Sequence, residues 1–413
     1  MITVEEATAQ VLSRIEVLEP ERVPLLAALG RVLAEDVISD IDVAPFDNSA
    51  MDGYALRYAD VANASEENPV TLNVVEHIPA GVAPERRVGP GEASRIMTGA
   101  PVPSGTDAVV MVERTRAGAN NGGAGGTVEI LTSAKSGENI RGRAEEVRAG
   151  EAVLLKGEVI GAAGIGLAAS VGHAELLVHR RPCVAIVSTG DELVDVTEKP
   201  GAGQIRNSNS YSLSAQVLAA GGEPHVLGVA RDNEADTRAL LSRAPEYDLM
   251  ITTGGVSMGD FDVVKKVLEE IGELDFWRVA MRPGAPQTFG TIDGTPFFGL
   301  PGNPTSTMVG FEMFVRPALR KMAGYTALAR PRAVATLTHD VKKKADRRYF
   351  LRGRLTASGD GSYQAAVSGN QSSALLTAMH RGNCLISLPE GESFIPAGAS
   401  VMCIRLDMEE GTA

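Results

Sequence analysis

Aromatic residues and cysteine are scarce in this 413-residue sequence. Phe, Trp and Tyr make up 4% of it, against 45 Gly and 22 Pro, so we expect cores of Ala, Val, Ile and Leu and many tight turns. The cysteines Cys183, Cys384 and Cys403 are far apart and form no C-x-x-C pair. This spacing argues against a disulfide framework and a thiolate zinc site and predicts reduced thiols.

Several common signatures are also missing. No apolar run approaches the roughly 20 residues of a membrane span, and residues 1–10 are polar and acidic, unlike a secretory signal. No H-x-x-x-H spacing, serine-hydrolase elbow or P-loop is present, which gives little support to histidine metal sites or these chemistries. We therefore predict a cytoplasmic protein.

The net charge of −13, from 39 basic and 52 acidic residues, opposes extended contact with nucleic acid or an anionic membrane. A small anionic ligand stays possible, because Arg side chains and backbone amides can set a positive potential inside a cleft. The length favours several domains, and 44% apolar with 22% charged residues is typical of chains that fold.

The hydrophobic pattern changes along the chain. Thr3 and Glu6 form a capping box before an amphipathic helix, and a second helix is predicted around residues 25–29. Short β-type runs follow from residue 41 to about 150, with a hairpin tip at 117–127. Between residues 181 and 324, β and helical runs alternate as in a parallel α/β sheet, ending in a long helix at 305–322. After residue 331 β runs return.

Three loops at predicted strand ends in the α/β region combine glycine with hydroxyl residues. They span residues 188–192, 252–260 and 299–305, and ligands of such sheets bind beyond the carboxyl ends of the strands. Asn303 at a helix N-cap and Pro304 at N1 leave free amides for an anion. The alternative is that Gly and Pro only mark strand ends, but three such loops together favour a site.

Charged residues accompany these loops. Carboxylates beside an anion site repel one another and the anion unless a hard cation such as Mg²⁺ bridges them to phosphate oxygens. Alternatively, some of these carboxylates, Asp260 above all, lie at helix N-termini and are stabilised by the helix dipole. These carboxylates are Asp191, Glu192, Asp232, Asp260 and Asp262. Arg278 and Arg282 flank a predicted strand, and their guanidinium groups could bind an oxyanion or a phosphate. Alternatively, both are solvated residues at the ends of the strand.

Three further segments remain open. The basic run 342–348 is interpreted as a solvated face, with a phosphate contact at an interface as the alternative. Residues 45–55 and 95–101 hold too many turn-forming and polar residues for ordinary strands, and we interpret both as functional loops.

These motifs resemble the molybdopterin molybdenumtransferases, the MoeA family, which includes the C-terminal domain of gephyrin. The resemblance runs in the same order over nearly the whole chain, and its motifs lie at residues 46–55, 97–103, 188–193, 254–257 and 299–304. It implies a multidomain α/β plus β protein: a discontinuous N-terminal mixed domain (1–41 plus 150–179), a β-rich lobe (42–149), a central α/β domain (180–326) and a small C-terminal β-barrel domain (327–413).

The resemblance also implies the activity, a molybdenum insertase. Adenylylated molybdopterin and molybdate bind, the phosphoanhydride is cleaved with Mg²⁺, and molybdenum cofactor and AMP are released. The family is a homodimer whose site joins the α/β domain of one subunit to the β-rich lobe of the other. Molybdopterin adenylyltransferase and molybdoenzyme apoproteins are implied transient partners.

Residue roles carry over by motif. Asp52 and Thr98 come from the partner's lobe, Glu192, Asp232 and Asp262 bind metal or orient the pyrophosphate, and Ser373 approaches the anion from the terminal domain. The remaining substrate and anion contacts are Ser188, Thr189, Gly190, Gly254, Gly255, Ser257, Arg278, Arg282, Pro301, Gly302, Asn303 and Pro304.

The chain departs from the family pattern at a few positions. Arg282-Pro283-Gly284-Ala285 stands where the family commonly has Lys before Pro-Gly and often Lys after it, Arg278 replaces another frequent Lys, and Glu146 replaces Asp. A non-catalytic molybdopterin-binding scaffold and a molybdopterin adenylyltransferase are the alternative functions.

Overall fold

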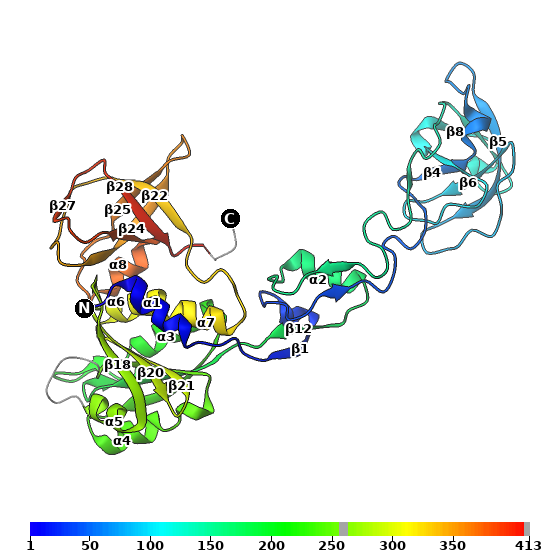
Figure 1. Cartoon of the computed structure of the whole chain (residues 1–413). Helices are drawn as coiled ribbons and strands as arrows, with labels where there is room; N and C mark the ends of the chain where they lie inside the picture. The colour runs from blue at the N-terminus through cyan, green and yellow to red at the C-terminus, as the bar shows by residue number, and fades with distance from the viewer. Residues whose placement is uncertain (256–262, 409–413) are drawn as a thin grey trace.

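The computed structural model describes residues 1–255 and 263–408. The molecule is elongated: a β-rich lobe lies at one end, the α/β unit and a terminal barrel lie at the other, and a narrow connecting region joins them (Figure 1). Within the described residues, no helix is both long and apolar enough to cross a membrane.

The α/β unit is built on a six-stranded sheet with the order β16-β13-β17-β21-β20-β18. The first four strands are parallel, as predicted, whereas β20 runs antiparallel to both of its neighbours, β21 and β18. Asp293 and Gly294, with φ of 47° and 82°, form the tight hairpin turn that makes β20 antiparallel to β21. The strands are β13 (Cys183–Thr189), β16 (Glu223–Ala230), β17 (Leu249–Thr253), β18 (Gly272–Arg278), β20 (Pro286–Ile292) and β21 (Thr295–Leu300).

Helices cover this sheet. The predicted capping box is confirmed, because the Thr3 hydroxyl accepts from the Glu6 amide and the Glu6 carboxylate accepts from the Thr3 amide. The buried face of α1 shares one core with the sheet and α7. The predicted long helix at 305–322 contains a π-helical segment at Phe311–Val315 between α6 and α7. The helices are α1 (Val4–Ser13), α3 (Asn209–Ala219), α4 (Glu234–Leu241), α5 (Val263–Ile271), α6 (Pro304–Gly310) and α7 (Arg316–Met322).

The β-rich lobe holds a six-stranded sheet with the order β7-β4-β6-β5-β9-β8. The predicted hairpin tip at 117–127 is confirmed between β8 and β9. Residues 53–56 form the buried strand β4 rather than a loop; Gly53 is needed there because a Cβ would lie 2.1 Å from the Val110 carbonyl oxygen. The strands are β4 (Gly53–Leu56), β5 (Val70–Ile78), β6 (Glu92–Ile96), β7 (Ala108–Met111), β8 (Thr115–Ala117) and β9 (Thr127–Ile130); β3 (Asn48–Ser49) pairs with β10 (Ile140–Arg141) nearby.

The connecting region has its own small core, drawn from two separate chain segments around residues 23–37 and 153–178. The helix predicted at 25–29 is a single 3-10 turn, Leu25–Ala28, which ends before Gly30 at a φ of 75°. The elements are β1 (Pro20–Pro24) paired with β12 (Glu175–His179), β2 (Val37–Ile38) paired with β11 (Ala152–Leu154), and α2 (Ala162–Ser170).

The terminal unit is a closed barrel, confirming that expectation: the strands follow β24-β25-β22-β28-β26, and β26 pairs back with β24. The short strand β19 (Met281–Arg282) leaves the α/β unit and pairs with β24, so Arg282 lies at the seam between the two units. The other elements are β22 (Arg332–Leu337), β23 (Val341–Lys342), β24 (Arg348–Ala357), β25 (Tyr363–Val367), α8 (Leu376–Arg381), β26 (Cys384–Leu388), β27 (Phe394–Ile395) and β28 (Ser400–Arg405), while β14 (Leu193–Val194) pairs with β15 (Ile205–Arg206) beside the α/β sheet.

Candidate functional site

The three strand-end loops of the α/β unit meet at one edge of the sheet. The Gly254 amide donates to the Leu300 carbonyl (3.1 Å), and a Cβ on Gly254 would lie 2.6 Å from the Thr189 hydroxyl oxygen. Gly302 lies against Gly254, since a Cβ there would be 3.5 Å from the Gly254 Cα. Gly254 and Gly255 have φ of 91° and 64°, which explains why glycine occupies the bend.

The predicted hydroxyl ligands of the first loop face the protein interior. The Ser188 hydroxyl is buried between the Asn207 side-chain oxygen (3.1 Å) and the Ser210 hydroxyl (2.9 Å). The Thr189 hydroxyl donates to the Thr253 carbonyl at 3.4 Å. Both groups therefore hold the loop in shape, and their hydrogen bonds are made within the protein.

Asn209, at the start of α3, connects two of the loops and was not singled out from the sequence. Its amide nitrogen donates to the Thr253 hydroxyl and to the Gly302 carbonyl, both at 2.8 Å. Its side-chain oxygen is buried and has no hydrogen-bond partner among the described residues. Buried polar atoms are normally satisfied, so this oxygen is a candidate acceptor for a bound ligand.

The described carboxylates beside these loops, Asp191, Glu192 and Asp232, are exposed. The Asp232 amide donates to the Asp191 carboxylate at 3.2 Å, which holds the ends of two neighbouring strands together. Their oxygen donors suit Mg²⁺, which usually binds one or two carboxylates together with substrate phosphates. Asp262, Ser257 and Asp260 lie outside the described residues.

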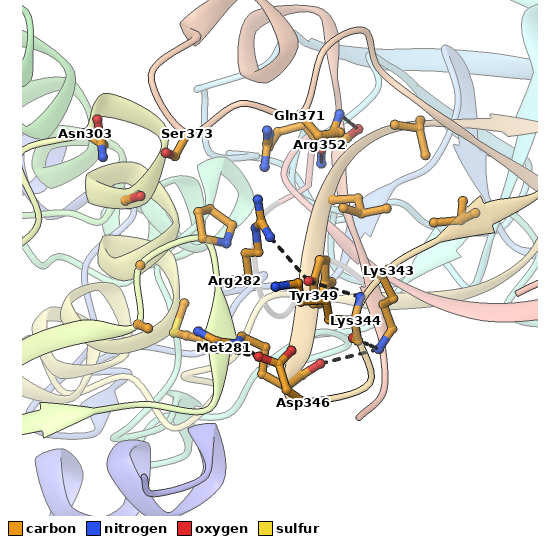
Figure 2. A pocket seen from close by; sticks show the side chains of 18 of the residues that line it. Met281, Arg282, Asn303, Lys343, Lys344, Asp346, Tyr349, Arg352, Gln371 and Ser373 are labelled. Atoms are coloured by element: carbon orange, nitrogen blue, oxygen red, sulfur yellow. Dashed lines mark hydrogen bonds and ion pairs between the residues drawn. The ribbon is translucent and has the colours of Figure 1, made fainter. Parts of the chain in front are cut away.

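A pocket of about 910 Å³ lies at the seam between the α/β unit and the barrel (Figure 2). Four residues singled out from the sequence line it together: Arg282, Pro301, Asn303 and Ser373. Asn303 is the N-cap residue of α6 with Pro304 in the first turn, as predicted, and its side chain makes no capping hydrogen bond. Arg278 does not line this pocket; it lies exposed at the end of β18.

Arg352, on β24, is the main pocket residue that the sequence analysis missed. Its side chain is only 1% exposed, and its Nε has no hydrogen-bond partner among the described residues. One terminal nitrogen donates to the Ser372 carbonyl at 3.3 Å. Burial, reinforced by the nearby charge of Arg282, lowers the pKa of Arg352 to about 10. A buried cation without a carboxylate partner favours the binding of an anion.

Hydrogen bonds hold the loop that carries Ser373 against both units. The Gln371 side chain accepts from the Arg352 amide (2.9 Å) and donates to the Arg352 carbonyl (3.1 Å). The Thr305 amide donates to the Ser373 carbonyl at 3.0 Å, linking the loop to the first turn of α6. Arg352, Ser373 and the α6 N-terminus are thereby fixed around one pocket, with Arg282 reaching in from β19 (Figure 2).

Part of the basic run 342–348 lines the same pocket, on the side away from Asn303 and Ser373 (Figure 2). Lys342, Lys343 and Lys344 are lining residues, and among the described residues none of them forms an ion pair. The Lys343 ammonium lies 5.0 Å from the ring centre of Tyr349, and Arg282 lies over the same ring at 5.5 Å. The pocket therefore gathers positive charge on a protein whose net charge is −13.

Asp52 and Thr98 form a separate polar pair in the β-rich lobe. One Asp52 oxygen accepts from both the amide and the hydroxyl of Thr98, each at 2.7 Å. These bonds, the amide first, lower the pKa of the Asp52 carboxyl. The β-rich lobe and the pocket lie at opposite ends of the elongated molecule, so Asp52 and Thr98 do not come near Arg352 within one chain (Figure 1).

Comparisons with known proteins match the whole length of the chain. Residues 2–172 match the MoeA N-terminal region (domain I and II), residues 185–321 match a probable molybdopterin binding domain, and residues 334–406 match the MoeA C-terminal region (domain IV). The molybdopterin molybdenumtransferase of Nostoc sp. is 41% identical over 395 residues, covering 94% of this chain and 89% of the relative.

Two further matches agree. The molybdopterin molybdenumtransferase of Bacillus subtilis is 38% identical over 413 residues, covering 100% of this chain and 95% of the relative. The crystal structure of a molybdopterin biosynthesis MoeA protein from Pyrococcus horikosii superposes with a TM-score of 0.83 at 33% identity, covering 99% of this chain and 100% of that one.

Proposed function

The chain belongs to the MoeA family of molybdopterin molybdenumtransferases, and we propose that it inserts molybdenum at the pocket between the α/β unit and the barrel. Adenylylated molybdopterin and molybdate are the proposed substrates, and molybdenum-bound molybdopterin and AMP are the proposed products, formed with cleavage of the phosphoanhydride bond. The observation that carries the proposal is the buried guanidinium of Arg352, whose Nε has no partner among the described residues.

We assign molybdate to Arg352, Arg282 and Ser373. A tetrahedral dianion between two guanidinium groups accepts charge-assisted hydrogen bonds and relieves their mutual repulsion. The Ser373 hydroxyl is a further donor at the same wall. The chain has Arg where the family commonly has Lys before Pro-Gly, and a guanidinium can hold two oxyanion oxygens at once.

The rest of the pocket suits the larger substrate. Its volume of about 910 Å³ is in the range of sites for drug-sized ligands and exceeds what one oxyanion needs. The loop from Pro301 to Pro304 borders the pterin in this proposal, and the ammonium groups of Lys342 to Lys344 attract the phosphate groups. Gly254, Gly255 and the Asn209 oxygen supply polar contacts where the strand-end loops meet.

Mg²⁺ is assigned to Glu192, Asp232 and Asp262. When bound, the ion would neutralise phosphate oxygens of the phosphoanhydride. The three carboxylates would hold the ion and orient the pyrophosphate, and the Asp232 amide, which donates to the Asp191 carboxylate, keeps the end of β16 in position.

Asp52 and Thr98 take part only if a second copy supplies them. We propose a homodimer in which the β-rich lobe of one chain faces the pocket of the other, because the elongated chain separates the two sets of polar residues (Figure 1). The Thr98 hydrogen bonds keep Asp52 ionised and oriented. The cytoplasmic location and transient contacts with an adenylyltransferase or an apoenzyme belong to this proposal; the three free thiols support a reducing compartment.

The test is release of AMP from adenylylated molybdopterin by the purified protein. We expect AMP and molybdenum-bound molybdopterin to accumulate only when molybdate and Mg²⁺ are both present. Wild-type turnover by the double variant Glu192→Gln and Asp262→Asn would contradict the assignment of Mg²⁺ to these carboxylates.

Two other outcomes identify the alternative functions. Tight binding of molybdopterin without AMP release would indicate a scaffold. Consumption of ATP with molybdopterin would indicate an adenylyltransferase.

A further inference from the structure

Away from the pocket, Cys183, Glu223 and His225 gather at the opposite end of the sheet. Their ligand atoms all lie within 4.8 Å of one another, and this is the one group of three potential metal ligands among the described residues. Cys183 begins β13 and Glu223 begins β16, and the two residues are paired in register. His225 lies two residues further along β16, on the same face as Glu223.

We propose that these three side chains form a zinc site that links the edge strand β16 to β13. Sulfur, imidazole nitrogen and carboxylate oxygen are the donors that Zn²⁺ binds in tetrahedral sites, with a water in the fourth position when the protein supplies three ligands. The charges balance: the Cys183 thiol releases one proton to solvent as the zinc–sulfur bond forms, and the thiolate and the Glu223 carboxylate neutralise the dication.

The geometry is close to what a zinc ion needs. The Cys183 sulfur already lies 3.9 Å from a Glu223 oxygen. Around a tetrahedral zinc ion, one sulfur, one nitrogen and one oxygen ligand are separated by roughly 3.3 to 3.5 Å, so no pair in the cluster has to approach by more than about 1.5 Å. Glu223 and His225 are exposed and on an edge strand, which leaves their side chains room for this rotation.

The surroundings favour a cation. The Glu223 carboxylate lies beside the Cys183 sulfur, and the Asp248 carboxylate accepts from the Cys183 amide, so two negative charges lie near the sulfur. Asp248 is held by Arg180 and by the Cys183 amide (2.8 Å), which leaves Glu223 as the carboxylate free to move. The ring of His225 lies 5.3 Å from that of Tyr247, which restricts its orientation.

Sequence spacing could not predict this site, since the three ligands come from two strands some 40 residues apart along the chain. The site lies at the amino ends of the strands, whereas the substrate loops follow the carboxyl ends. We therefore assign the zinc a role in stability rather than in turnover, and the inference does not depend on the proposed function.

The experiment is a titration of the chelator-treated full-length protein with Co²⁺, followed by displacement with Zn²⁺. We expect one equivalent per chain, a sulfur-to-cobalt charge-transfer band, and a melting temperature that rises with Zn²⁺. Cys183→Ala abolishes the band, and His225→Ala and Glu223→Gln weaken Co²⁺ binding by about tenfold or more. His380→Ala, an exposed histidine in the barrel, is the matched control and keeps wild-type binding.

Either of two results would overturn the proposal: wild-type protein without a sulfur-to-cobalt band, or a band that persists in Cys183→Ala. If Cys183→Ala does not fold, as judged by circular dichroism, the exposed variants decide. Unchanged Co²⁺ affinity in both His225→Ala and Glu223→Gln then rejects the site.

Discussion

Replacing Arg352 by methionine separates binding of the anion from stability. Arg352 is buried, its Nε has no hydrogen-bond partner in the part of the chain that the structure describes, and its pKa is lowered from the ordinary arginine value to about 10. A lowered pKa means that the folded protein disfavours the cation, and this penalty is present at neutral pH and disappears only above the folded pKa. The shift corresponds to about 3 kcal/mol as an order of magnitude.

Methionine fills a similar volume without charge, and the variant loses one long hydrogen bond to the Ser372 carbonyl, worth about 1 kcal/mol. We therefore expect Arg352→Met to be more stable than the wild type by about 1 to 2 kcal/mol without molybdate, which corresponds to a rise of a few degrees in melting temperature. A hydrogen bond to a charged group contributes about 1.5 to 3 kcal/mol, so molybdate should bind about 10- to 150-fold more weakly.

Two assays measure these effects. Isothermal titration gives the molybdate dissociation constant, and thermal unfolding with and without molybdate gives the shift that the anion causes, which should be present in the wild type and nearly absent in the variant. Arg354→Met, an exposed arginine on the same strand, is the matched control. Wild-type affinity in Arg352→Met would refute the anion assignment, and a lower melting temperature without molybdate would refute the desolvation argument.

Three further predictions concern the remaining parts of the site. Lys344→Ala should raise the KM for adenylylated molybdopterin about 2- to 5-fold and reduce its salt dependence, whereas Lys156→Ala, at an exposed lysine far along the chain, should change neither; equal effects of the two variants would exclude a role of the basic run 342–348 in substrate binding. Mixing inactive Asp52→Asn and Glu192→Gln chains should restore about a quarter of the wild-type AMP release, since half of the dimers then hold one intact site of two; no recovery would contradict a shared site. Thr98→Val should raise the pKa of Asp52, measured by NMR titration, and Thr98→Ser should not. The stabilisation from that lowered pKa is present above the ordinary value and lost as pH falls through the folded value, so Thr98→Val should be less stable than the wild type at neutral pH and should match it only in acid, whereas Thr98→Ser should match it throughout; an unchanged Asp52 pKa in Thr98→Val would rule out the hydroxyl contribution.

The loops at the strand ends could be predicted because their shape follows from the conformational preferences of single residues. Gly254 and Gly255 adopt positive φ, and Asn303 with Pro304 starts a helix; these preferences belong to the residues themselves. Because the carboxyl ends of parallel strands share one edge, the loops at Gly190, Gly254 and Pro301 could be placed together before the fold was known.

Other features depended on contacts between distant segments. The Ser188 hydroxyl was predicted to contact a ligand, yet it forms hydrogen bonds with the Asn207 and Ser210 side chains instead. Arg352 follows a buried stretch of β24, and nothing in its sequence neighbours shows that it lacks a carboxylate partner. Sequence patterns record which residues follow one another, and they do not record which side chains remain unsatisfied after packing.

By itself, the sequence determined the alternation of strands and helices, the glycine and proline turns at the strand ends, and the family resemblance that implies the chemistry. Only the tertiary structure decided where the charge lies. The tertiary structure pairs β19 with β24, which brings Arg282 and Arg352 into one pocket at the seam between two units. It also places Asp52, in the β-rich lobe, at the opposite end of the molecule (Figure 1). Electrostatic interactions act through space and depend on burial, so a chain with a net charge of −13 can still present a positive pocket.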